Sequence, residues 1–95
     1  MVAAEYALAI KLRPSSAELY VKASTCYRLS NALDIAEDML SMAKDRESGF
    51  PEIYRERGFI FEKKGQMPEA RQEFEKYLDL APNAPDRMFI EMKIK

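Results

Sequence analysis

The chain has 95 residues, of which 47% are hydrophobic and 33% are charged, a balance suited to one small folded domain and too apolar for a disordered segment. The 15 basic and 16 acidic residues nearly cancel and are interspersed, which argues against the basic stripe typical of nucleic-acid binding. No apolar stretch approaches the roughly 20 residues that a membrane-spanning helix needs. Cys26 is the single cysteine, which excludes an intramolecular disulfide and favours a reducing compartment such as the cytoplasm.

The first predicted helix runs from Val2 to Arg13, where apolar residues recur at spacings of three and four. Pro14 ends this helix because proline has no amide donor and restricts the residue before it. Ser15 and Glu18 then form a predicted capping box, in which each side chain satisfies an exposed backbone amide of the other. This box predicts a second helix over about residues 17–30.

The later helices are predicted from the residues that separate them. Asn31 tolerates the left-handed backbone of a tight turn, and Gly65 occupies the equivalent position one repeat later. Pro51 suits the first position of a helix. No segment alternates with the period of a strand, so the sequence predicts an all-α fold of about six antiparallel helices. The third to sixth predicted helices span about residues 33–46, 51–64, 67–80 and 85–95.

The sequence nearly repeats itself after 34 residues, so that residues 17–50 lie over residues 51–84. A fixed period of this length is typical of stacked repeats, in which each unit buries its apolar face against its neighbours. The matched pairs are Tyr20 and Tyr54, Ser24 and Gly58, Tyr27 and Phe61, Asn31 and Gly65, Leu33 and Met67, Ala36 and Ala70, and Leu40 and Phe74.

Small residues at matched positions predict where two helices approach closely. Ser24 and Gly58 lie in the first helix of each pair, and Ala36 and Ala70 lie in the second. Large side chains are expected to fill the neighbouring gaps. These large residues are Tyr20, Tyr27 and Leu40 in the first pair and Tyr54, Phe61 and Phe74 in the second, with Ala43 or Tyr77 facing the next unit.

This pattern resembles the tetratricopeptide repeat family. Residues 51–84 are the closer match, while Arg57 and Tyr77 stand where the family usually has leucine and alanine. The resemblance implies a single domain over residues 1–95, built as a right-handed α-solenoid. Its predicted parts are the second helix of a preceding repeat over 1–16, two complete repeats over 17–50 and 51–84, and a C-terminal capping helix over 85–95. The residues that carry the match in the second repeat are Tyr54, Gly58, Phe61, Gly65, Ala70, Phe74 and Pro82.

Catalysis is not expected from this sequence. It contains no histidine, so the usual general base and metal ligand are missing. Cys26 has no histidine partner, lies inside a predicted helix, and is expected to pack as a small apolar residue. Neither a glycine-rich phosphate loop nor a metal-ligand spacing occurs, so no enzyme activity, cofactor or metal is predicted.

A binding role is implied by the resemblance, because the first helices of such repeats line a concave surface that holds partner proteins. Positions turned away from the packing face carry balanced charge, and they include Glu56 and Ile90. Some members of the family grip a terminal carboxylate with asparagine and lysine, but Thr25 and Phe59 stand where asparagine would be needed. We therefore expect an apolar anchor flanked by charge. The candidate partner-binding residues are Val21, Thr25, Arg28, Arg55, Phe59, Glu62, Lys63 and Phe89.

The sequence leaves two classes of function open. The first is a noncatalytic module that binds a peptide or helix of a partner protein in the concave groove. The second is a structural or self-assembly scaffold that acts through its helical ends, as a homodimer or as a piece of a longer repeat protein. The last helix favours the second class, because its apolar residues lie on more than one face: Met88, Phe89, Ile90, Met92 and Ile94. A regulatory fragment of an enzyme is a more distant third alternative.

Overall fold

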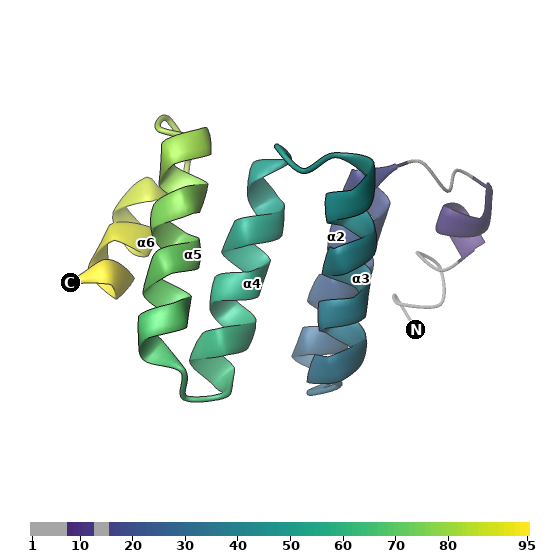
Figure 1. The fold of residues 1–95 in the computed structure, drawn as a ribbon, viewed down its shortest axis with the longest axis horizontal. Helices are drawn as coiled ribbons and strands as arrows, with labels where there is room; N and C mark the ends of the chain where they lie inside the picture. The colour runs from purple at the N-terminus through teal and green to yellow at the C-terminus, as the bar shows by residue number, and fades with distance from the viewer. Residues whose placement is uncertain (1–7, 13–15) are drawn as a thin grey trace. The chain divides into compact units, whose positions relative to one another are not determined.

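The computed structural model describes residues 8–12 and 16–95 as helices joined by short turns (Figure 1). Residues 8–12 are helical, and the described ranges contain no strand, which confirms an all-α helical repeat. The chain divides into two compact units, unit 1 (Met1–Phe50) and unit 2 (Pro51–Lys95), at the boundary between the two predicted repeats. The grouping of residues 1–95 into one domain stays a prediction. The helices are α2 (Ala17–Leu29), α3 (Leu33–Arg46), α4 (Pro51–Lys63), α5 (Met67–Leu80) and α6 (Arg87–Ile94).

The start of α2 differs from the predicted capping box. The side chain of Ser16 accepts a hydrogen bond from the Leu19 amide, with 3.4 Å between the two atoms. Ser16 is therefore the N-cap residue, and the third helical residue is Leu19 instead of the glutamate that a box requires. Ser15 lies outside the described residues, as does most of the helix predicted over residues 2–13.

Both helix pairs turn through a residue in the left-handed region, as predicted. Asn31 has a φ of 67° between α2 and α3, and Gly65 has a φ of 78° between α4 and α5. Asparagine and glycine adopt this conformation at the lowest cost. The backbone amides of Ala32 and Gln66 donate to the carbonyls of Tyr27 and Phe61, so the two turns close in the same way.

In unit 1, α2 packs against α3 through small residues. Ser24 is fully buried, and its hydroxyl donates to the Ala36 carbonyl across a distance of 2.8 Å. Ala36, Leu40 and Ala43 of α3 are almost completely shielded from solvent. The close approach predicted for Ser24 and Ala36 is therefore confirmed, and a hydrogen bond reinforces it.

In unit 2, the ring of Phe74 packs directly against Gly58 where α4 meets α5. A Cβ atom added to Gly58 would lie 2.4 Å from the nearest ring atom of Phe74, much closer than van der Waals contact allows. Phe74 is only 1% exposed, so its ring could move away from such a Cβ atom only by disturbing the core. Glycine at position 58 is what lets a phenylalanine occupy the place that Leu40 has in unit 1.

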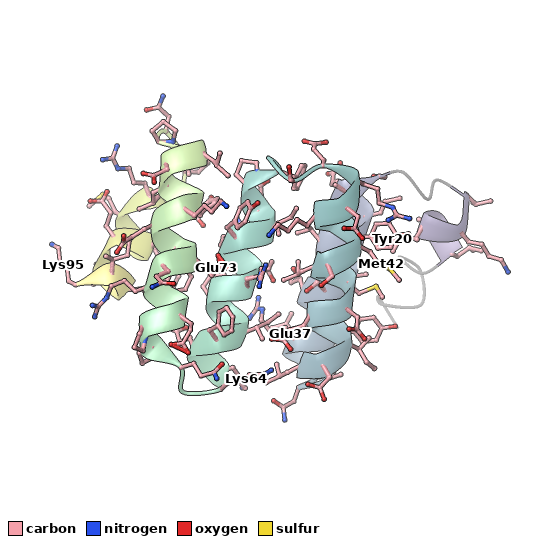
Figure 2. All side chains as sticks on the ribbon, viewed as in Figure 1. Tyr20, Glu37, Met42, Lys64, Glu73 and Lys95 are labelled. Atoms are coloured by element: carbon pink, nitrogen blue, oxygen red, sulfur yellow. The ribbon has the colours of Figure 1, made fainter. Side chains whose placement is uncertain are left out.

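The arginine that departs from the family pattern joins the same two helices at their surface. The Nε atom of Arg57 lies 3.3 Å from a carboxylate oxygen of Glu73. Figure 2 labels Glu73 on the side of α5 that faces α4. Arg57 therefore adds an ion pair between α4 and α5, which stay packed against each other.

Helix α6 packs on α5 and completes unit 2 (Figure 1). Its Ile90 is fully buried, which confirms that one face of the helix covers the preceding one. Met88 and Met92 on α6 are 81% and 73% exposed. The helix begins at Arg87, slightly later than predicted, because Asp86 has non-helical dihedral angles and serves as the N-cap residue.

Candidate functional site

Four of the predicted binding residues come together in unit 2. Arg55, Phe59 and Glu62 lie on α4, and Phe89 lies on α6. Side chains from these two helices meet although the backbone of α6 packs on α5. We call the resulting surface the α4–α6 face; it consists of Arg55, Phe59, Glu62, Asp86, Phe89 and Lys93.

One end of the α4–α6 face is a hydrogen-bonded network around Tyr77. The phenol of Tyr77 donates to a carboxylate oxygen of Asp86 across 2.6 Å. The guanidinium of Arg55 lies 3.5 Å from the other oxygen of Asp86 and 5.6 Å from the centroid of the Tyr77 ring. Three elements are thereby joined, since Arg55 belongs to α4, Tyr77 to α5 and Asp86 to the start of α6.

This network shifts the pKa values of two of its members. Burial, followed by the hydrogen bond to Asp86, raises the pKa of Tyr77 to about 12, while Arg55 opposes this shift. Burial alone would lower the pKa of Arg55, but Glu56, Tyr77 and Asp86 together raise it above its ordinary value. Tyr77 therefore stays a neutral hydrogen-bond donor, and Arg55 stays charged, throughout the physiological range.

The other end of the α4–α6 face surrounds the ammonium group of Lys93. Its Nζ atom lies 3.1 and 3.0 Å from the two carboxylate oxygens of Glu62. The same atom lies over two aromatic rings, 4.8 Å from the centroid of Phe89 and 5.8 Å from that of Phe59. Lys93 thus links α6 to α4 by charge and by cation–π contact.

The two aromatic residues of the α4–α6 face differ in exposure. Phe59 is half-buried, and its ring packs edge-on against Phe74, with centroids 5.4 Å apart and an interplanar angle of 65°. Phe89 is 55% exposed. Phe59 is therefore partly covered by its own unit, and Phe89 offers the larger accessible apolar surface.

The candidates on α2 lie in unit 1 and are described separately. The prediction that Val21 faces away from the core is wrong, because Val21 is only 4% exposed. Thr25 is half-buried, and its hydroxyl donates to the Val21 carbonyl at 3.2 Å. Arg28 is also half-buried, whereas Lys63 of unit 2 is exposed at the end of α4.

Two further positions expected to face outward are buried in unit 2. Glu56 is 2% exposed, with a carboxylate oxygen 3.6 Å from Nε of Arg55, and Ile90 is fully buried. These positions are 34 residues apart, so they occupy the same place in the repeat. The predicted outward arc is therefore too wide in unit 2, whereas Lys22 at the matching position of unit 1 is exposed.

The repeat itself carries a sequence signal for the α4–α6 face. Arg55 and Phe89 are one 34-residue period apart, and so are Phe59 and Lys93. The order of cation and aromatic residue is therefore reversed between α4 and α6. In the structure, Lys93 of α6 lies over the ring of Phe59 of α4, whereas Arg55 lies over the ring of Tyr77 of α5.

Within residues 8–12 and 16–95, no three His, Cys, Asp or Glu side chains are grouped so that they could hold a metal ion. None of the helices in these ranges is both long enough and apolar enough to cross a membrane. Cys26 is a half-buried free thiol inside α2.

The structure defines an all-α protein of antiparallel helix pairs with a matched turn in each pair. The family model described as Tetratricopeptide repeat matches residues 22–95. The chain belongs to this family, as its sequence pattern indicates. No curated protein matches the sequence.

Several solved structures are similar to this chain. The Arabidopsis OM64 TPR domain is 23% identical with a TM-score of 0.85, and the match covers 97% of this chain and 76% of that one. The Yersinia enterocolitica type III secretion chaperone SycD is 14% identical with a TM-score of 0.84, covering 97% and 73%. The first TPR of Spaghetti (RPAP3) is 21% identical with a TM-score of 0.79, covering 94% and 71%. At these identities the likeness shows the fold.

Proposed function

We propose that this chain is a noncatalytic protein-interaction module, and that the α4–α6 face holds an extended peptide or a helix of a partner protein. The observation that carries the proposal is the composition of this face. It combines the half-exposed ring of Phe89 with Phe59 and with the charged groups of Arg55 and Glu62. Aromatic and arginine side chains with charged neighbours are the usual energetic centres of protein interfaces.

Two similar structures support a peptide as the ligand class. The first TPR of Spaghetti (RPAP3) was solved bound to the HSP90 peptide SRMEEVD. The chaperone SycD was solved in complex with a peptide of the translocator YopD. For this chain we propose only the same class of ligand, a peptide, and not those particular peptides. The reason is that Phe59 stands where an asparagine that binds a terminal carboxylate would be needed.

The proposal predicts that Phe89→Ala weakens peptide binding about tenfold, because the substitution removes the accessible aromatic anchor. Peptides would be selected from a random library on the immobilised wild-type protein, and their affinities measured by fluorescence anisotropy. Phe89 is a better target than Phe59, because Phe59 also packs against Phe74 in the core.

The matched control is Met88→Ala, which truncates the adjacent and more exposed apolar residue of α6. We expect this variant to bind the selected peptides within about twofold of wild type. Equal losses in the two variants, or no loss in Phe89→Ala, would count against the α4–α6 face as the binding surface.

The scaffold alternative rests on a different observation. Met88 and Met92 lie one turn apart on α6, and both are largely exposed. Self-association through this surface would appear in equilibrium sedimentation and would be lost in a Met88→Ala and Met92→Ala double variant. A strict monomer at high concentration would exclude self-assembly through α6.

A further inference from the structure

The Lys93 ammonium occupies a cation site built from other residues of unit 2. Phe89 and Phe59 present aromatic rings to it at 4.8 and 5.8 Å, and both oxygens of Glu62 accept its hydrogen bonds. Ring faces attract a cation through their quadrupole, and the carboxylate supplies the opposite charge. Two rings and a carboxylate are a suitable binding set for an alkylammonium ligand.

Another ammonium group can displace that of Lys93 without leaving a buried charge unpaired. The side chain of Lys93 is 21% exposed and that of Glu62 is 31% exposed, so the ion pair is in contact with water. Because the pair is only partly buried, breaking it costs less than breaking a fully buried ion pair. Lys93 can reach solvent on its flexible stem when it leaves, and a second ammonium would then find both rings and the carboxylate in place.

We propose that Phe59, Phe89 and Glu62 bind the ammonium group of a lysine in a partner peptide, and that Lys93 occupies this site until the peptide displaces it. This inference rests on the proposed function and names a basic segment as its ligand. Lys93 is tethered to the site, so its effective concentration is high and a small cation competes poorly with it. A peptide must add further contacts, which makes Lys93 a built-in competitor that selects against weak ligands.

Removing the side chain of Lys93 tests this inference directly. Tetramethylammonium chloride and N-acetyl-lysine amide would be titrated into wild type and into Lys93→Ala, with the ring signals of Phe59 and Phe89 followed by NMR. We expect Lys93→Ala to bind both cations about tenfold more tightly than wild type, because the tethered competitor is gone.

Two further variants isolate the cause of the gain. Lys95→Ala removes the same charge from the end of the chain, where Figure 2 shows Lys95 pointing away from the helices, and it should behave as wild type. Adding Glu62→Gln to Lys93→Ala should abolish the gain, because the carboxylate that pairs with the cation is then missing. The NMR signals of buried Ile90 report whether α6 stays docked in each variant.

The inference is overturned if Lys93→Ala binds the cations no more tightly than Lys95→Ala does. It is equally overturned if the Ile90 signals shift to those of an undocked helix, since Lys93 would then be a structural tie. Neither result concerns the selected peptides, whose dependence on Phe89 tests the proposed function separately. Selected peptides that require Phe89 but no lysine would leave the proposed function standing and refute this ligand.

Discussion

Replacing Gly58 by serine is expected to lower the free energy of unfolding by about 2 kcal/mol, although serine occupies the matching position in unit 1. The reason is the ring of Phe74, whose nearest atom would lie 2.4 Å from the new Cβ. Serine has a higher helix propensity than glycine, but this gain of about 0.5 kcal/mol is smaller than the cost of overpacking a closed core. Urea denaturation of the two proteins measures the difference.

The matched control pairs this change with Phe74→Leu, which gives unit 2 the Ser24 and Leu40 combination of unit 1. Once leucine replaces the ring of Phe74, serine at position 58 has room. Its hydroxyl can then donate to the Ala70 carbonyl, as Ser24 donates to the Ala36 carbonyl. We expect a favourable coupling energy of about 1–3 kcal/mol in the double-mutant cycle. Additive effects of the two substitutions would show that Gly58 and Phe74 do not constrain each other.

The second large effect is a loss of stability in alkali that depends on Tyr77. Its pKa is about 12 in the folded chain, against an ordinary value of 10.0. Between these values the unfolded chain releases the phenolic proton while the folded chain keeps it, so the free energy of unfolding falls as pH rises. The stabilisation is complete below about pH 10, and up to about 2–3 kcal/mol of it is lost by about pH 12.

Tyr77→Phe isolates this contribution, because phenylalanine cannot titrate. At neutral pH the variant should be less stable by about 1–3 kcal/mol, since Asp86 loses a short hydrogen bond. The difference between wild type and variant should then shrink as the pH of urea denaturation is raised from about 8 to about 11. Parallel curves for the two proteins would contradict the raised pKa of Tyr77.

The fold could be predicted largely from the 34-residue period. Close helix packing requires small residues such as Ser24 and Gly58, and left-handed turns require residues such as Asn31 and Gly65. The sequence therefore indicates both features directly. The predicted capping box was wrong because two adjacent serines, Ser15 and Ser16, offer alternative helix starts. Only the hydrogen bond from the Leu19 amide identifies Ser16.

The candidate site was predicted in part. Helical phase correctly grouped Arg55, Phe59 and Glu62, because side chains at spacings of three and four share a helix face. The 34-residue period added Phe89, at the position that matches Arg55. The same phase failed for Val21, which is 4% exposed, whereas Phe89 at the matching position of α6 is 55% exposed.

The contacts within the site could not be predicted from helical phase. The network of Tyr77, Asp86 and Arg55 depends on side-chain distances across three elements. The position of Lys93 over two rings depends on such distances between α4 and α6. Two departures from the repeat pointed toward these contacts. Tyr77 replaces the usual alanine, and the reversed order of cation and aromatic residue distinguishes α6 from α4.

Site-specific photocrosslinking tests the central claim most directly, because it reports which surface a partner touches. A photoreactive phenylalanine analogue would replace Phe89 on the α4–α6 face in one protein and Met42 of α3 in the other; Met42 is 41% exposed and labelled in Figure 2. We predict that the analogue at position 89 crosslinks to the selected peptides and that the one at position 42 does not. Crosslinking from position 42 alone, or equally from both positions, would contradict binding at the α4–α6 face.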